Sequence, residues 1–247
     1  MVMVDSIIII PTYNEKENIE AIIRAVFSLE NKFDILIIDD NSPDGTANIV
    51  KELQKTYSSK LHLLERSGKL GLGTAYIFGF DWCLKNGYTY IFEMDADFSH
   101  NPIDLNHLYT AAKENAPALV VGSRYVSGVN VVNWPMGRIL MSYYGSAYVR
   151  FISGIPVRDT TAGFVCYHRK ILEKIDFKKI RMKGYGFQIE MKFYTWKMGV
   201  KIVEIPIIFT DRKQGSSKMS GGIFKEAIIG VFKMKVRSWF NKYPNIN

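Results

Sequence analysis

A series of short β-branched runs, each ending in a polar turn, constrains the fold of this chain more than any other feature. The first run, residues 6–10 (SIIII), has no polar alternation, which is typical of a strand covered on both faces. Further strands are predicted at residues 33–38, 61–65 and 118–122, and one more starts at Tyr90. Segments of helical length separate these runs, so we predict right-handed βαβ units in a mostly parallel sheet.

The end of the first strand and the start of the first helix are predicted from local residue preferences. Pro11 has no N–H for a strand ladder, so it should end the first strand. Asn14, followed by the acidic residues Glu15 and Glu17, predicts the cap and first turn of a helix that runs to about Leu29.

Three polar clusters, at residues 11–15, 39–46 and 95–100, each follow the end of a predicted strand. Ligands of mostly parallel sheets bind beyond the carboxyl ends of the strands. We therefore expect the three clusters to line one crevice.

Two aspartates separated by one residue, Asp95 and Asp97, end the strand that starts at Tyr90. Side chains alternate along a strand, so both carboxylates should point to the same face as the strand leaves the sheet. Carboxylate oxygens are ligands that Mg²⁺ and Mn²⁺ prefer. The pattern alone is common by chance, and its place in the expected crevice is what favours a metal site.

Length and composition limit the classes of protein to which the chain can belong. Its 247 residues fit one α/β domain with a sizeable core. The net charge of +8 indicates an anionic partner, but no basic stripe with interleaved aromatic residues points to nucleic acid. Cys83 and Cys166 lack metal-ligand spacing, which predicts two buried, reduced thiols.

Two amphipathic stretches predict that the protein contacts a membrane surface. Neither a signal peptide nor an apolar run of 18 residues is found, so we expect no spanning helix. Residues 136–155 and 223–240 place aromatic and apolar side chains beside basic ones, which indicates helices in a lipid interface. Helical spacing puts one set of side chains of the second stretch on a single face: Phe224, Ile228, Val231, Phe232 and Trp239. That helix could instead pack on the domain or bind a partner.

Six motifs occur in one order across nearly the whole chain: PTYNE (11–15), DDNSPDGT (39–46), GLGTAY (71–76), MDAD (94–97), GSRY (122–125) and the segment 211–218. Together they resemble the inverting family 2 glycosyltransferases, and within these the dolichol-phosphate, or polyprenyl-phosphate, mannose synthases. The resemblance implies an α/β fold of GT-A type, with a catalytic domain at residues 1–220 and an amphipathic helix at 221–247. It also implies GDP-mannose as the donor and a membrane polyprenyl (dolichyl-type) monophosphate as the acceptor.

The resemblance assigns the donor site to residues of the first, second and fourth motifs. Contacts to the nucleotide base and ribose are implied for five residues: Pro11, Tyr13, Glu15, Ile38 and Asp40. Asp95, Ala96 and Asp97 would hold the diphosphate and the metal ion. Some relatives have a glutamine metal ligand two residues after the second aspartate, where this chain has Ser99, a weaker oxygen ligand.

Basic residues of the later motifs are implied to bind phosphate. Arg124, Arg212 and Lys218 match positions that bind donor or acceptor phosphates, and Arg138 with Ser142 matches an acceptor-phosphate site. The correspondence loosens after Ser142. The implied catalytic residues are Asp95, Asp97, Arg124 and Arg212.

The chemistry of such a transfer also predicts acidic and basic residues in one site. Charge builds up on the leaving phosphate as the sugar becomes oxocarbenium-like, and a metal held by Asp97, with Asp95 close by, can take up that charge. A phosphate monoester has a second pKa near 6, so it is already anionic at pH 7 and needs no general base. Catalysis then reduces to positioning and charge stabilisation by residues such as Arg124 and Arg138.

Two other functions remain open from the sequence. The same chemistry could use UDP-glucose or UDP-GlcNAc, with a lipid phosphate or a growing glycan as acceptor. A nucleotide-sugar-binding subunit without turnover is a different class, although such a subunit would not need Asp95 and Asp97. Relatives often have further transmembrane helices after this point, so we expect a peripheral enzyme on the cytoplasmic face of a membrane, or one that recruits a membrane-anchor subunit.

Several polar residues have two interpretations that the sequence leaves open. Asp159 can be an active-site acid or a turn residue, and Glu190 can complement a helix dipole or serve in the active site; Gln188 is similarly placed. His100 is expected to lead into a helix rather than to bind a ligand. Lys69, in a glycine-rich turn, is a lesser phosphate candidate.

Overall fold

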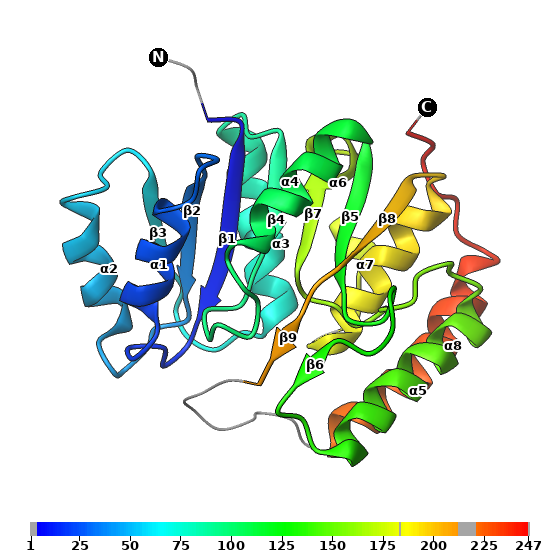
Figure 1. The fold of residues 1–247 in the computed structure, drawn as a ribbon. Helices are drawn as coiled ribbons and strands as arrows, with labels where there is room; N and C mark the ends of the chain where they lie inside the picture. The colour runs from blue at the N-terminus through cyan, green and yellow to red at the C-terminus, as the bar shows by residue number, and fades with distance from the viewer. Residues whose placement is uncertain (1–3, 183, 212–220, 247) are drawn as a thin grey trace.

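A seven-stranded sheet forms the centre of the protein in a computed structural model, which describes residues 4–182, 184–211 and 221–246. The strand order is β3-β2-β1-β4-β7-β5-β8. The strands are β1 (Ser6–Thr12), β2 (Asp34–Asp39), β3 (Leu61–Glu65), β4 (Tyr90–Glu93), β5 (Ala118–Ser123), β7 (Val165–His168) and β8 (Lys201–Pro206). Neighbouring strands are parallel except for β7, which is antiparallel to both β4 and β5. The mostly parallel sheet is therefore confirmed (Figure 1).

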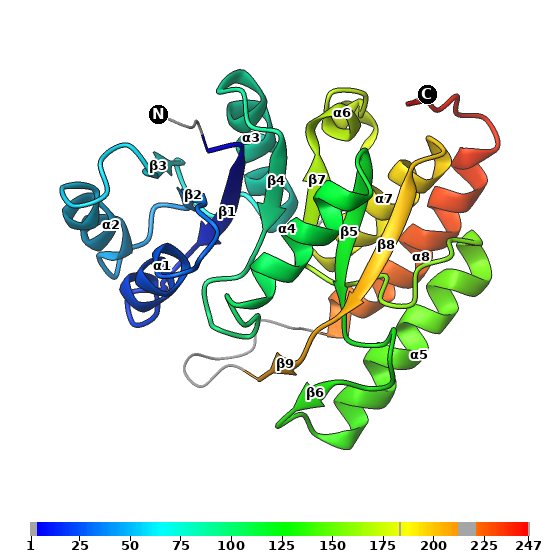
Figure 2. The same ribbon diagram turned by 45° about the horizontal axis from the view of Figure 1, so that its top comes forward.

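Helices cover both faces of this sheet, as Figures 1 and 2 show. One face carries α1 (Ile19–Phe27), α2 (Thr46–Gln54) and α4 (Asp104–Glu114). The other face carries α3 (Leu72–Lys85), α6 (Arg169–Leu172) and α7 (Tyr185–Lys197). The remaining elements are α5 (Met136–Ser153), α8 (Gly221–Ser238), the 3-10 helix η1 (Phe177–Lys179), and β6 (Val131–Val132), which pairs with β9 (Phe209–Thr210).

The core explains why the first strand shows no polar alternation. Ile8 and Ile10 pack under α1, α2 and α4, whereas Ile7 and Ile9 pack under α3 and α7. All four side chains are fully buried. A strand with helices on both sides has no face left for polar residues. Cys83 and Cys166 are likewise buried, and both are free thiols, as predicted.

Pro11 does not end β1, contrary to the prediction from the sequence. The strand runs one residue further, and Pro11 lies opposite Ile38 of β2. The carbonyl of Ile9 faces β4, and alternation along the strand turns Pro11 to the same side. The β4 ladder has already ended there, at the pair Ile9 and Glu93. The missing N–H of Pro11 therefore leaves no gap in the sheet.

The first helix also begins later than predicted, at Ile19 rather than near Asn14. Asn14 has a positive φ of 58°, so its backbone turns away from a helical path. The N–H groups of residues 14–16 donate instead, over 3.0 to 3.1 Å, to side chains of the turn after β2, namely Ser42, Thr46 and Asp44. These contacts between distant segments replace the local capping that the sequence suggested, and they join two of the three polar clusters.

The antiparallel strand β7 brings a further segment to the edge of the sheet where the polar clusters lie. Because β7 runs in the opposite direction, its start lies beside the ends of β4 and β5. The segment before it, residues 158–163, therefore meets the residues that follow β4 and β5. The antiparallel direction of β7 thus brings residues 158–163 to the edge at which β4 and β5 end, at the bottom of Figure 1.

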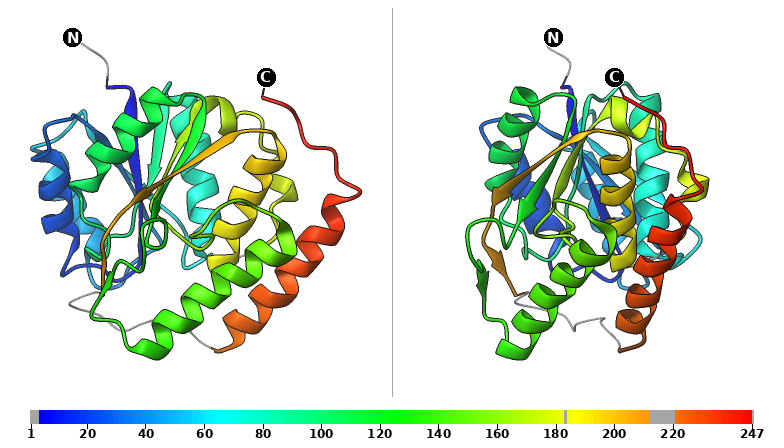
Figure 3. Two further views of the ribbon diagram at one scale, coloured as in Figure 1. Left: turned by 45° about the vertical axis from the view of Figure 1, so that its right-hand side comes forward. Right: turned by 90° about the vertical axis from the view of Figure 1, so that its right-hand side faces the viewer.

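Helices α5 and α8 lie side by side outside α7 (Figures 2 and 3). Val231 and Met234 of α8 are buried against Val149 of α5 and residues of α7. Lys235 of α8 donates a hydrogen bond of 2.9 Å to the carbonyl of Ser153. No helix within the described part of the chain has the length and apolar character needed to cross a membrane.

Candidate active site

The acidic residues that follow β4 lie in a loop. β4 ends at Glu93, so Asp95 and Asp97 are not at alternating strand positions, and the expected strand geometry is wrong. The N–H of Ser99 donates to Oδ1 of Asp97 over 3.1 Å. The buried hydroxyl of Ser99 has no hydrogen-bond partner among the described residues. Both aspartates and Ser99 nevertheless face the same cavity.

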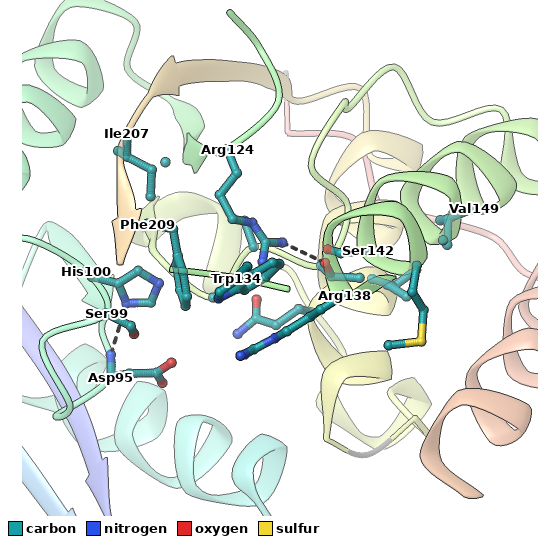
Figure 4. Close-up of a pocket in the computed structure, with 18 of the residues that line it drawn as sticks. Asp95, Ser99, His100, Arg124, Trp134, Arg138, Ser142, Val149, Ile207 and Phe209 are labelled. Atoms are coloured by element: carbon teal, nitrogen blue, oxygen red, sulfur yellow. Dashed lines mark hydrogen bonds between the residues drawn. The ribbon is translucent and has the colours of Figure 1, made fainter. Parts of the chain in front are cut away.

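That cavity has a volume of about 610 Å³ and reaches from the acidic loop to the space between α5 and α8. Six of the residues predicted for the site line it: Asp95, Asp97, Ser99, Arg124, Arg138 and Ser142. Its far end is lined mainly by apolar and aromatic side chains, including Leu140, Met141, Tyr144, Tyr148, Ile228 and Val231. Figure 4 shows Asp95, Ser99 and His100 on one side, Arg138 and Ser142 on the other, and Phe209 and Trp134 between them. One pocket therefore joins acidic, basic and apolar parts.

Arg124, which follows β5, is held by the segment that precedes β7. Its Nε and Nη2 donate to Oδ2 and Oδ1 of Asp159 over 2.7 and 2.6 Å, and Nη2 also donates to Thr161 over 2.9 Å. Burial alone would raise the pKa of the Asp159 carboxyl, but the charge and hydrogen bonds of Arg124 lower it below its usual value. Asp159 is thus neither a free acid nor a simple turn residue, because it orients Arg124.

Arg138, from the first turn of α5, forms the second basic contact of the cavity. Its Nη1 donates to Oδ1 of Asp211 over 2.9 Å, and its guanidinium lies 4.1 Å from the centre of the Trp134 ring. Ser142, one turn later, accepts a hydrogen bond of 2.7 Å from the hydroxyl of Tyr125. Stacking on Trp134 holds the planar guanidinium in the cavity.

His100 lies four residues before α4 and forms part of the cavity wall. It stacks on Phe164, with 4.8 Å between ring centres, and its Nδ1 accepts the N–H of Asp95 over 3.4 Å. Burial lowers the pKa of His100 to about 4, so the ring is neutral at pH 7. A neutral ring is the form that can accept this hydrogen bond.

Gln188 and Glu190, on α7, have different surroundings. Gln188 lines the cavity, and its Nε2 donates to Glu93. Glu190 faces away from it: Oε2 accepts the N–H groups of Arg181 and Met182, both over 2.7 Å, and Oε1 accepts from Arg237. Glu190 therefore holds the backbone of residues 181–182 and the Arg237 side chain of α8. It is not an active-site carboxylate.

The first two polar clusters meet each other, but they do not line this cavity. Asp40 is bound through both oxygens by Arg66, over 2.6 and 2.7 Å, and the side chain of Ile38 is fully buried in the core. A side-chain contact of Ile38 to a nucleotide is thus not supported. Lys69 lies 4.9 Å from the centre of the Tyr13 ring. Arg66 was missed because a lone arginine after a strand carries no distinctive sequence signal.

The other residues predicted for the donor site lie outside the lining of the cavity or outside the described part of the chain. Pro11 and Glu15 are partly buried beside the turn after β2, and Ala96 is buried in the acidic loop. Arg212 and Lys218 lie outside the described residues.

The donor atoms fit a divalent ion that shares its ligands with a substrate. Within residues 4–182, 184–211 and 221–246, no group of three or more His, Cys, Asp or Glu side chains could hold a metal ion by itself. Asp95 and Asp97 supply carboxylates, and Ser99 supplies a hydroxyl. Mg²⁺ typically takes one or two carboxylates and completes its shell with water and phosphate oxygens.

Comparison with known sequences identifies the family. The model of the family described as Glycosyl transferase family 2 matches residues 7–176. The chain belongs to glycosyltransferase family 2. It is 44% identical over 232 residues to polyprenol monophosphomannose synthase of Mycolicibacterium smegmatis, covering 94% of this chain and 87% of that protein. It is also 44% identical over 223 residues to undecaprenyl-phosphate mannosyltransferase of Micrococcus luteus, covering 90% of each.

Solved structures of similar fold support the architecture of this family 2 glycosyltransferase. Glucosyl-3-phosphoglycerate synthase from Mycobacterium tuberculosis, in complex with Mn²⁺, UDP and glucosyl-3-phosphoglycerate, superposes with a TM-score of 0.67 at 16% identity, covering 94% of this chain and 80% of that one. The same enzyme with Mn²⁺, UDP-glucose and glycerol 3-phosphate gives a TM-score of 0.68. The α/β fold of GT-A type is thereby confirmed.

Proposed function

We propose that this family 2 glycosyltransferase transfers mannose from GDP-mannose to a polyprenyl monophosphate and produces polyprenyl-phosphate-β-mannose. One observation carries the proposal: a single cavity joins Asp95 and Asp97 to Arg124 and Arg138, and then continues between α5 and α8 as an apolar pocket. A charged head joined to a long apolar tail is the kind of molecule that such a cavity fits. The names of the two relatives at 44% identity agree with this substrate class.

The leaving group is assigned to the acidic end of the cavity. Asp95 and Asp97, with Ser99, would hold a divalent ion, Mg²⁺ or Mn²⁺, which when bound would supply positive charge to the departing diphosphate. The two structures of glucosyl-3-phosphoglycerate synthase, which share the fold, contain Mn²⁺ with UDP or UDP-glucose. The motif residues Pro11, Tyr13 and Glu15 are proposed to bind the nucleoside part.

The acceptor phosphate is assigned to the basic end, at Arg124, Arg138 and Ser142. A phosphate oxygen attacks the anomeric carbon from the face opposite the diphosphate, the carbon–oxygen bond to the diphosphate breaks, and the configuration inverts. The phosphate is already ionised at pH 7, so no residue has to remove a proton. The acidic side chains next to these arginines, Asp159 and Asp211, are occupied as their ion-pair partners. The protein supplies orientation and positive charge.

The outer surfaces of α5 and α8 are proposed to rest on a membrane. Phe151 of α5 is 87% exposed, Phe232 of α8 is 58% exposed, and Trp239, directly after α8, is 69% exposed. Exposed aromatic and aliphatic side chains on paired helices are suited to the interface of a bilayer. The lipid tail of the acceptor would enter the cavity between the two helices.

The cytoplasmic face of the membrane is the proposed location. Cys83 and Cys166 are both buried, free thiols, which suits a reducing compartment.

A donor and acceptor screen tests the proposal. The purified chain is incubated with Mg²⁺ or Mn²⁺, one short polyprenyl phosphate, and GDP-mannose, UDP-glucose or UDP-GlcNAc in turn. We expect product from GDP-mannose only, with the β configuration by NMR. The matching polyprenol, which lacks the phosphate, should give no product because no base is supplied for an alcohol. Transfer from a uridine nucleotide alone, or to the alcohol, would contradict the proposal.

A further inference from the structure

A fully buried lysine on α7 has no part in the chemistry proposed above. Lys192 is 0% exposed, and its Nζ donates to three acceptors: the carbonyl of Ala162 over 2.6 Å, and the carbonyl and Oε1 of Gln188, each over 3.3 Å. Three acceptors match the three protons of an ammonium group. Burying such a charge is costly, and an apolar side chain of the same size would fill the space at lower cost.

The main contact of Lys192 is to the segment that orients Arg124. Ala162 directly follows Thr161, and Thr161 and Asp159 both bind Arg124. Residues 161–163 line the cavity. Lys192 is fully buried and does not itself line the cavity, so it holds this wall from within the protein.

A second clamp holds the other end of the same segment. Glu204 of β8 accepts the N–H of Arg158 over 2.7 Å and the N–H of Asp159 over 2.9 Å. Residues 158–163 are therefore fixed by Glu204 at the start and by Lys192 near the end. The bidentate pair of Asp159 with Arg124 lies between the two clamps.

The other contact of Lys192 leads to the acidic end of the cavity. Gln188, one helical turn before Lys192, donates to Oε2 of Glu93, which directly precedes the loop of Asp95. Glu93 is itself fully buried, and its Oε1 has no hydrogen-bond partner among the residues that the structure describes. The Nζ of Lys192 is thus linked through Gln188 to the buried side chain of Glu93 and directly to the segment that holds Arg124.

We propose that Lys192 is a positioning residue that fixes residues 158–163, and through them Arg124, relative to the acidic loop after β4. Its ammonium group holds the Ala162 carbonyl on the basic side and supports Gln188 and Glu93 on the acidic side. The distance between Arg124 and the acidic loop is thereby fixed before any ligand binds. A displacement of about 1 Å in such an arrangement can lower turnover roughly 100-fold.

Hydrogen exchange tests the clamp without reference to the substrate. The N–H groups of Arg158, Asp159 and Ala162 are hydrogen-bonded, so their exchange reports whether the segment is held. In Lys192→Met, amides of residues 158–163 should exchange faster, because the Ala162 carbonyl has lost its donor. The control is Lys197→Met, the same change at an exposed position of the same helix, which should leave this exchange unchanged.

A double variant separates positioning from stability. Lys192→Met removes the donor that holds Gln188 beside the fully buried Glu93, whose Oε1 already has no hydrogen-bond partner among the described residues, so thermal stability should fall. In Glu93→Gln/Lys192→Met the buried acid is replaced by an amide of the same size and the melting temperature should recover, while exchange of residues 158–163 stays fast. If the double variant regains slow exchange together with its stability, Lys192 acts only by offsetting the buried acid and the proposal is overturned.

A kinetic test of the positioning role depends on the proposed function, because it measures mannose transfer. The kcat for transfer to polyprenyl phosphate should fall roughly 10- to 100-fold in the double variant, whereas GDP affinity, measured by calorimetry, should stay within about twofold of wild type. An inactive wild-type chain would defeat the proposed function and leave the exchange result standing. Unchanged kcat and unchanged exchange in the variants would overturn the positioning role itself.

Discussion

Arg124 and Asp159 face each other in a bidentate pair, in which Nε and Nη2 donate to Oδ2 and Oδ1 over 2.7 and 2.6 Å. The N–H of Arg124 also donates to Oδ2 over 2.9 Å. Asp159 is fully buried and Arg124 is 8% exposed. The direction of this guanidinium is thus set by the protein, which removes part of the cost of ordering it when a phosphate arrives.

Removing the carboxylate of this pair should harm both stability and turnover. In Asp159→Asn the buried Arg124 keeps its charge without a counter-ion, and the free energy of unfolding should fall by about 3–5 kcal/mol. Chemical denaturation measures this. The matched control is Glu20→Gln, which breaks an exposed pair with Arg24 and should leave the unfolding midpoint near that of wild type. Equal effects of the two changes would contradict the structural role of Asp159.

The same pair predicts how stability depends on pH. Burial acts to raise the pKa of Asp159, but Arg124 outweighs it and the pKa in the folded protein is lowered. The contribution of Asp159 to stability is therefore complete above its unfolded pKa of about 3.9, and it is lost as pH falls through the lower folded value. The difference in melting temperature between wild type and Asp159→Asn should be constant from pH 5 to 7 and shrink at more acidic pH. A difference that grows on acidification would reverse the assigned sign.

Asp97→Asn should abolish the turnover that depends on a divalent ion. The carboxylate is removed from the donor set, while the change in volume is small, so the variant should stay folded by circular dichroism. The measurement is mannose transfer with and without a chelator. Asp81→Asn, at an exposed carboxylate of α3 that pairs with Lys85, should keep full, chelator-sensitive activity. Full activity of Asp97→Asn would dismiss its role at the metal.

Arg138→Ala should raise the KM for the lipid phosphate far more than the KM for the nucleotide sugar. The side chain stacks on Trp134 at the basic end of the cavity, and a loss of roughly 10-fold or more in acceptor affinity is expected for a charge-assisted contact. Arg138→Lys should recover only part of it, because lysine lacks the planar fork. Arg169→Ala, on α6, is the control. A larger effect on the donor KM would reassign Arg138 to the donor site.

Membrane binding is best tested with point changes, since α8 packs on the domain through Val231 and Met234 and its deletion would expose core. The double variant Phe232→Glu/Trp239→Glu should lower sedimentation with liposomes that contain anionic lipid. Both side chains are exposed, so the melting temperature should be unchanged. Phe78→Glu, at an exposed position of α3, should sediment like wild type. If wild type itself does not sediment, a separate membrane-anchor subunit would have to bring it to the lipid.

Sequence patterns predicted the strands well where burial on both faces leaves a continuous apolar run. The strand at residues 61–65 was placed at its observed bounds, and the run at residues 6–10 forms most of β1. The same patterns failed at Pro11 and Asn14, because the outcome there depends on neighbours that are distant in the sequence. β4 stops before it reaches Pro11, and the turn after β2 takes over the N–H groups of residues 14–16.

The sequence predicted the site residues that belong to motifs, and it missed those whose role depends on packing between distant segments. Asp97 and Arg124 belong to motifs with a recognisable order, and both line one cavity, as expected. Lys192 and Glu204 gave no signal, because a charged residue within a helix or strand is usually exposed and only the packing shows otherwise. The role of Asp159 depends on a strand that runs against its neighbours, and strand direction cannot be read from residue preferences.

The antiparallel insertion of β7 also affects the order in which the protein can be built. β4 and β5 are separated by the width of one strand, and that strand is synthesised about 40 residues after β5 (residues 118–123 against 165–168). A nascent chain that has emerged only as far as residue 150 exposes open edges on both β4 and β5, and open edges invite mispairing. The catalytic pocket is therefore a late product of translation, and truncated chains that end before residue 168 should be targets for chaperones rather than partly active enzymes.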